Sequence, residues 1–135
     1  MQIELSTKEF RNLLDLVYIG NWVLNSTRGE DRFAIYDNLE SKLFALAHAH
    51  GMKSLAETEE GTVIPSKAYT EGGIHEAIAY YEDNVFFQIL AEELSRRDMN
   101  YPEITPENHM EILCRMEQYM QEFESSGVDR LVLVE

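Results

Sequence analysis

The chain has 135 residues, of which 44% are hydrophobic and 27% are charged. This length and composition predict a single folded domain over residues 1–135 and exclude a disordered or fibrous chain. The charge is unusual, because 25 acidic and 11 basic side chains give a formal net charge of −14. Such a field repels phosphate groups, so we expect no binding to nucleic acid and none to an anionic membrane surface.

Cysteine content and the start of the chain predict where the protein resides. Cys114 is the single cysteine, which excludes an internal disulfide and a zinc site built from cysteines. The first residues lack the basic segment and the long apolar run of a signal peptide, and no apolar stretch has the length of a membrane span. We therefore expect a cytoplasmic protein.

The first predicted helix covers residues 7–25 and opens with a capping-box pattern, Ser6 with Glu9. A helix that is apolar on several faces lies centrally or at an interface. Three stripes at helical spacing fit that description: Phe10, Leu14, Val17, Asn21 and Leu24; Leu16, Ile19 and Val23; and Tyr18 with Trp22.

Asn21 is the polar member of the main stripe of this helix. A buried asparagine at such a position can fix the register of a helix pair, and across a subunit interface it would indicate a dimer. Alternatively, Asn21 hydrogen-bonds to a loop or to its own backbone. Both interpretations stay open at this point.

A second helix is predicted over residues 31–50, and Gly51 suits its end. Its residues His48 and His50 lie two positions apart, so on a helix they point in nearly opposite directions and cannot chelate one metal ion. We expect no metal ligands here. One face of this helix is apolar and is expected to be buried: Tyr36, Leu39, Leu43, Leu46 and His50.

Helical periodicity disappears over residues 51–73, where Gly61 and Pro65 interrupt the backbone and Thr62–Ile64 could form a short strand. Connections of this length are often lids over functional sites. A third helix follows over residues 74–98 and carries apolar residues on two opposite sides. It is therefore expected to be buried on both sides or to bend near Asn84.

A fourth helix is predicted from Pro106 to about residue 125, with Thr105 as its N-cap. The β-branched run Leu131–Val134 favours a strand, and its expected partner is Gln2–Leu5. The sequence thus predicts a mainly α fold: a four-helix bundle-like domain with a small β-ribbon that pairs the N- and C-terminal segments.

The sequence contains no catalytic motif above chance, which leaves enzymatic activity open and gives no catalytic residue, metal ligand or cofactor to name. The favoured hypothesis is a non-enzymatic, self-associating protein-interaction module whose partner is a second copy or another protein, because the first and third helices carry excess apolar surface.

Two other functions stay open. One is a helical ligand- or metal-binding protein whose pocket is covered by residues 51–73. The other is an acidic mimic that occupies a basic, nucleic-acid-binding surface of another protein. The expected ligand-binding residues of the first alternative are Trp22, His50, Tyr80 and Tyr81.

Overall fold

The structure is a computed structural model that describes all 135 residues, and it confirms a mainly helical fold with a small two-stranded ribbon. No helix combines the length and the apolar character needed to cross a membrane. The four long helices are α1 (Thr7–Asn25), α2 (Ala34–Ala49), α4 (His75–Asp98) and α5 (Pro106–Ser126). Between α2 and α4 lie a 3-10 turn (Lys53–Leu55), β1 (Ala56–Glu59), β2 (Thr62–Pro65), α3 (Lys67–Tyr69) and a turn (Thr70–Ile74) that kinks at Gly73.

The chain divides into two compact units, Met1–Ile78 and Ala79–Glu135. Helix α4 begins in the first unit and ends in the second. The single domain over residues 1–135 stays a prediction.

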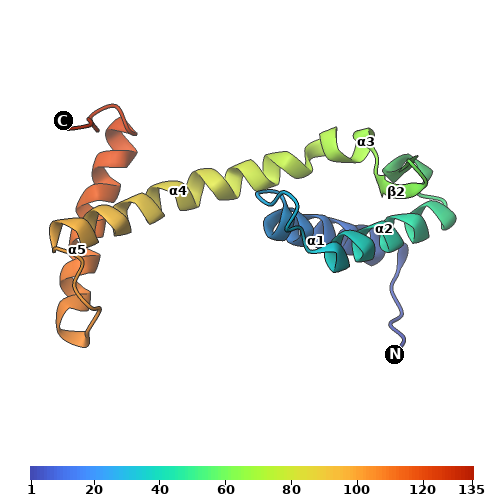
Figure 1. Cartoon of the computed structure of the whole chain (residues 1–135), viewed down its shortest axis with the longest axis horizontal. Helices are drawn as coiled ribbons and strands as arrows, with labels where there is room; N and C mark the ends of the chain where they lie inside the picture. Colours follow the sequence, from blue (N-terminus) through green and yellow to red (C-terminus); the bar gives the residue numbers. More distant parts are fainter. The chain divides into compact units, whose positions relative to one another are not determined.

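The first unit is built on the antiparallel pair α1 and α2. Figure 1 shows the β1–β2 hairpin and α3 on one side of this pair and the N-terminal segment on the other side. Phe44 and Tyr69 pack edge to face in the core, with ring centroids 5.0 Å apart. The Tyr69 hydroxyl donates a 2.8 Å hydrogen bond to Asp15. The buried core cluster consists of Leu14, Phe44, Ala47, Ala56 and Tyr69.

The ribbon is not the predicted pair of chain ends, but one of its strands contains Thr62–Ile64, the short strand that the sequence allowed. Strands β1 and β2 pair antiparallel, with Glu59 opposite Thr62. Glu60 and Gly61 between them have φ of 49° and 80°, the left-handed conformation that a two-residue hairpin turn requires. Residues 1–5 and 131–135 form no strand, so the predicted pairing of Gln2–Leu5 with Leu131–Val134 is wrong. Closing a two-residue turn costs far less chain entropy than joining the two ends of the chain.

The segment 51–73 is also more ordered than its sequence pattern predicted. It supplies two members of the core, Ala56 and Tyr69. The Ser66 hydroxyl donates to the Ser54 carbonyl and accepts from the Tyr69 amide, which ties the start of α3 to the 3-10 turn. The segment is therefore a structural part of the first unit.

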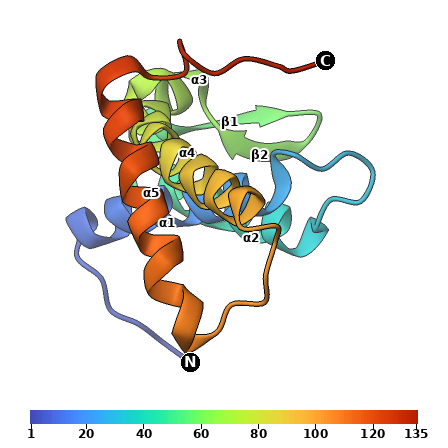
Figure 2. The same cartoon turned by 90° about the vertical axis from the view of Figure 1, so that its left-hand side faces the viewer.

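The second unit consists of α4 from residue 79 onward, α5 and the C-terminal residues. Figure 2 shows α5 crossing α4. Phe87 of α4 packs against Phe123 of α5, with ring centroids 5.3 Å apart. The Tyr119 hydroxyl also donates to Asp98. As predicted, α5 begins after Thr105, whose hydroxyl accepts from the Asn108 amide.

Candidate functional site

Asn25 fixes the connection between α1 and α2. It is 1% exposed, and its Oδ1 accepts a 2.8 Å hydrogen bond from the amide of Phe33, the N-cap residue of α2. Its Nδ2 donates to the Phe33 carbonyl at 3.2 Å and to Oδ1 of Asn21 at 2.7 Å. This side chain holds the loop before α2, which explains why α2 begins at Ala34 rather than at the predicted residue 31.

Asn21 links the two helices. Its Nδ2 donates to Oδ1 of Asp37 at 3.0 Å and to Oε2 of Glu40 at 3.1 Å. Asp37 also accepts two hydrogen bonds from Arg32, Nε to Oδ2 at 3.0 Å and Nη2 to Oδ1 at 2.8 Å. Asn21 therefore bonds across two helices of one chain and not to a loop or its own backbone, and its control of the register stays a prediction.

The two carboxyl groups of this network differ in their electrostatics. The hydrogen bonds from Arg32 lower the pKa of Asp37 below its usual value. Burial raises the pKa of Glu40 to about 7, although the amide of Asn21 opposes that shift. Near neutral pH the network therefore holds one firmly ionised carboxylate and one group that exchanges a proton.

A small polar pocket of about 200 Å³ opens beside this network. The Trp22 ring meets the His75 ring edge to face, with centroids 6.1 Å apart, and the Tyr18 hydroxyl lies 2.6 Å from Nε2 of His75. The pocket thus combines aromatic, cationic and carboxyl groups. Its lining residues are Tyr18, Asn21, Trp22, Ser26, Arg32 and Glu40.

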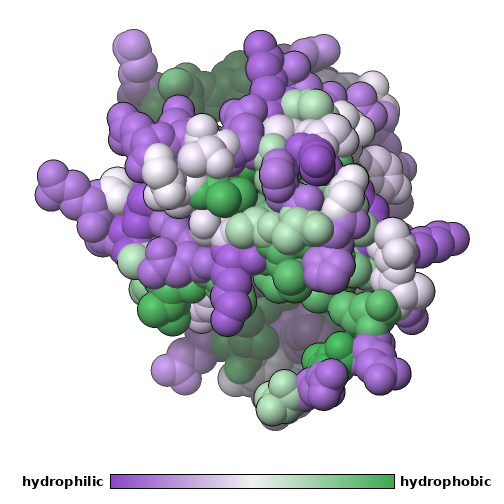
Figure 3. All heavy atoms as spheres, turned by 90° about the vertical axis from the view of Figure 1, so that its right-hand side faces the viewer, coloured by the Kyte–Doolittle hydropathy of each residue, from purple (hydrophilic) through white to green (hydrophobic).

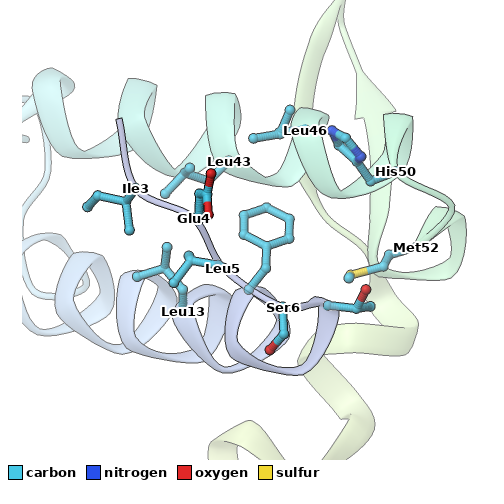
Figure 4. A pocket seen from close by; sticks show the side chains of 11 residues that line it. Ile3, Glu4, Leu5, Ser6, Leu13, Leu43, Leu46, His50 and Met52 are labelled. Atoms are coloured by element: carbon cyan, nitrogen blue, oxygen red, sulfur yellow. The ribbon is translucent and has the colours of Figure 1, made fainter. Parts of the chain in front are cut away.

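A larger groove of about 690 Å³ lies between α1, α2 and the N-terminal segment. Figure 4 shows Ile3 and Leu5 of that segment grouped with Leu13 of α1 and with Leu43 and Leu46 of α2. Apolar side chains dominate the wall. His50 and Met52 line the groove as well.

The groove is one end of a broader apolar surface, which we call the hairpin face. On α1 it lies opposite the buried side that carries Leu14, Asn21 and Asn25. In Figure 3, hydrophobic side chains gather in the lower part of the face that is turned to the viewer. The hairpin face consists of Leu13, Leu16, Val17, Gly20, Val23 and Leu24 of α1 and Ile35, Leu39, Leu43 and Leu46 of α2.

The hairpin face overturns one sequence expectation. The apolar face of α2 was expected to be buried. Its member Leu43 is half-buried and packs against the core, but Tyr36, Leu39, Leu46 and His50 are exposed. Helix α2 instead turns Phe44 and Ala47 into the core and its carboxyl groups Asp37 and Glu40 toward Asn21. The reason is the Asn21 network, which needs these polar groups between the helices and so rotates the apolar stripe outward.

The four residues expected to bind a ligand do not line one pocket. Trp22 lines the polar pocket and His50 lines the groove, whereas Tyr80 and Tyr81 belong to the second unit, where they are 74% and 63% exposed. Ligand binding by these residues stays a prediction. Arg32 and Glu40 were not predicted as site residues, because Arg32 acts through Asp37 and Glu40 through Asn21 on the facing helix.

No three His, Cys, Asp or Glu side chains lie close enough together to hold a metal ion. Among the four histidines, His75 makes the clearest contacts, and these are with Tyr18 and Trp22. The chain matches no protein-family model, and no curated protein or solved structure is significantly similar to it.

Proposed function

We propose that this chain is a protein-interaction module that associates with a second copy of itself through the hairpin face. One observation carries the proposal: the most apolar sides of α1 and α2 point away from the core. Leu16 and Ile35 are each 69% exposed, and Val23 is 61% exposed. Contiguous apolar surface of this extent on a folded protein usually marks a contact with a partner.

The size of the surface supports a stable contact. Six aliphatic members of the hairpin face are more than a third exposed, as are Ile3 and Leu5, and this group is of the size that contributes to a standard interface of about 800 Å² per partner. Two such helix pairs packed face to face would form a four-helix arrangement around a twofold axis. The contact would be isologous, because each copy offers the same surface.

Charge supports a second copy as the occupant. Two chains that each carry a net charge of −14 repel each other over most of their surface. The hairpin face contains no charged residue, since its ten members are aliphatic residues and one glycine. Glu4 lines the groove at one end of this surface, so two copies would meet mainly through uncharged side chains, with one carboxylate of each copy at the border.

Sedimentation velocity of the full chain tests this function. From about 1 to 100 μM we expect a concentration-dependent dimer. Leu16→Glu would bury a carboxylate in the contact and weaken the dimer at least about 100-fold, a loss of about 2.7 kcal/mol. Asn38→Glu is the matched control, because it adds the same charge at an exposed position of α2 outside the hairpin face.

Two results would overturn the proposal. One is a wild-type chain that stays monomeric over the whole concentration range. The other is a Leu16→Glu variant that associates as the wild type does while its circular dichroism is unchanged.

The proposal includes a cytoplasmic location. Cys114 is an exposed free thiol, which suits a reducing compartment. Thiol labelling of the chain in intact cells would find Cys114 reduced, and recovery of the chain as a disulfide-linked dimer would contradict this location.

A further inference from the structure

Helix α4 has two apolar sides within the second unit, and only one of them packs against α5. Phe87 contacts Phe123 on that side, and Ala91 and Ser95 are buried there as well. Tyr81, Val85 and Ile89 follow one another at i, i+4 and i+8, so they share the opposite side. The sequence predicted that α4 is buried on two sides. Within the second unit, α5 covers one of these sides, and the other is left uncovered.

We call this opposite side the α4 face and define it as Tyr81, Val85, Phe86 and Ile89 with the carboxylates of Glu82 and Glu92. Tyr81, Phe86 and Ile89 are more than half exposed, and Val85 is half-buried. An amphipathic helix recognises a partner helix through anchors at this spacing. The geometry thus describes a helix-docking surface about three turns long.

Charge identifies the kind of partner. From His75 to Ser95 the chain contains no lysine or arginine. Glu82, Asp83 and Glu92 form no ion pair, whereas Glu93 lies 3.7 Å from Arg96. The second unit as a whole holds thirteen acidic and four basic side chains. A second copy would place like charges against this face, which disfavours self-association here.

We infer that the α4 face binds a basic amphipathic helix of another protein. Leucine-like side chains of the partner would pack on Val85 and Ile89, and its lysine or arginine side chains would pair with Glu82 and Glu92. The exposed rings of Tyr81 and Phe86 can also receive a cation on their faces. The inference concerns a different unit and a different partner from the proposed self-association.

The probe is a synthetic helical peptide of leucine and lysine, with the leucines on one side, titrated into the full-length chain and followed by fluorescence anisotropy. The same peptide with every lysine replaced by glutamate is the charge control. We expect the basic peptide to bind and the acidic peptide not to bind. The double variant Tyr81→Ala/Ile89→Ala is expected to raise the Kd at least about tenfold.

Matched variants separate specific docking from general attraction to an acidic protein. Glu82→Gln/Glu92→Gln is expected to weaken binding and to reduce its salt dependence. Met110→Ala and Glu117→Gln alter exposed residues of α5 and are expected to leave the Kd unchanged. If these α5 variants weaken binding as much as the α4 variants do, or if Tyr81→Ala/Ile89→Ala binds like the wild type, the inference fails.

Peptide binding to the α4 face can be tested separately from the proposed dimer. Leu16→Glu lies in the first unit and is expected to bind the peptide with the wild-type Kd even where it no longer dimerises. Loss of peptide binding in Leu16→Glu would place the peptide on the hairpin face instead and overturn the assignment to α4.

Discussion

The Nδ2 atom of Asn21 lies 3.1 Å from Oε2 of Glu40, so a buried amide of α1 donates to a half-buried carboxyl group of α2. The same amide donates to Asp37, which is already held by Arg32. The Asn21 amide is therefore shared between Glu40 and Asp37, and Asp37 stays ionised. Burial raises the pKa of Glu40 to about 7, and this makes the stability of the helix pair depend on pH.

Glu40→Gln is expected to stabilise the protein at pH 8. The folded state binds the Glu40 proton more tightly than the unfolded state does, because the pKa is about 7 when folded and 4.5 ordinarily. Stability is therefore lost as the pH rises from 4.5 through 7, and the loss is complete above 7. Glutamine stays neutral and keeps an acceptor for Asn21. After allowance for partial exposure, we expect a gain of about 1–2 kcal/mol at pH 8 that vanishes near pH 4.

Urea unfolding at pH 4 and at pH 8 measures this difference. Glu57→Gln is the matched control, because Glu57 is an exposed carboxylate of β1, and its effect on stability is expected to stay within about 0.5 kcal/mol. A Glu40→Gln variant that is less stable than the wild type at pH 8 would contradict the role assigned to burial.

Two adjacent glycines before α4 are expected to respond in opposite ways to alanine. Gly73 has φ of +114°, where an L side chain is strained, whereas Gly72 has an ordinary φ and open space around its Cα. We expect Gly73→Ala to lose about 1–2 kcal/mol and Gly72→Ala to be neutral or to gain up to about 1 kcal/mol. Thermal unfolding of the two variants gives the comparison, and equal midpoints would contradict the strain expected at Gly73.

The helices were predictable from the sequence because their signals are local. Ser6 and Glu9 form the capping box that starts α1, and Thr105 with Pro106 starts α5. The strand at Thr62–Ile64 was visible in the sequence, but its pairing was not, and the pairing of the chain ends was predicted wrongly because β-branched residues there carry the same propensity. What decides between the two pairings is the two-residue turn at Glu60–Gly61, whose entropic advantage does not appear in strand propensity.

The orientation of α2 was the main feature that sequence periodicity could not give. Leu39 and Leu46 make the more apolar stripe, which normally predicts the buried side. The structure places Glu40 and Phe44 inward. Asn21, nineteen positions before Glu40, donates to that carboxyl group, and Asn25 accepts from the amide of Phe33, eight positions later. The spacing of apolar residues along α2 does not reveal hydrogen bonds to a different helix. Excess apolar character of α1 and α4, in contrast, was visible in the sequence, since it is a property of each helix.

Asn25 carries the strongest test of how the hairpin is held. Asn25→Ala removes the acceptor for the Phe33 amide and the donor for Asn21. The Asn21 oxygen then lacks this partner in a buried site, and the Phe33 amide lacks its partner in a part-buried one. Unsatisfied buried groups cost about 1–3 kcal/mol each, so we expect a loss of about 2–4 kcal/mol by urea unfolding. Asn38→Ala is the matched control on the exposed side of α2, where alanine favours the helix and stability is expected to rise slightly. Because Asn25 sets where α2 begins, its loss would also loosen the hairpin face, and the dimer is expected to weaken together with stability. A loss in Asn25→Ala no larger than about 0.5 kcal/mol would mean that the loop, rather than this side chain, positions the two helices.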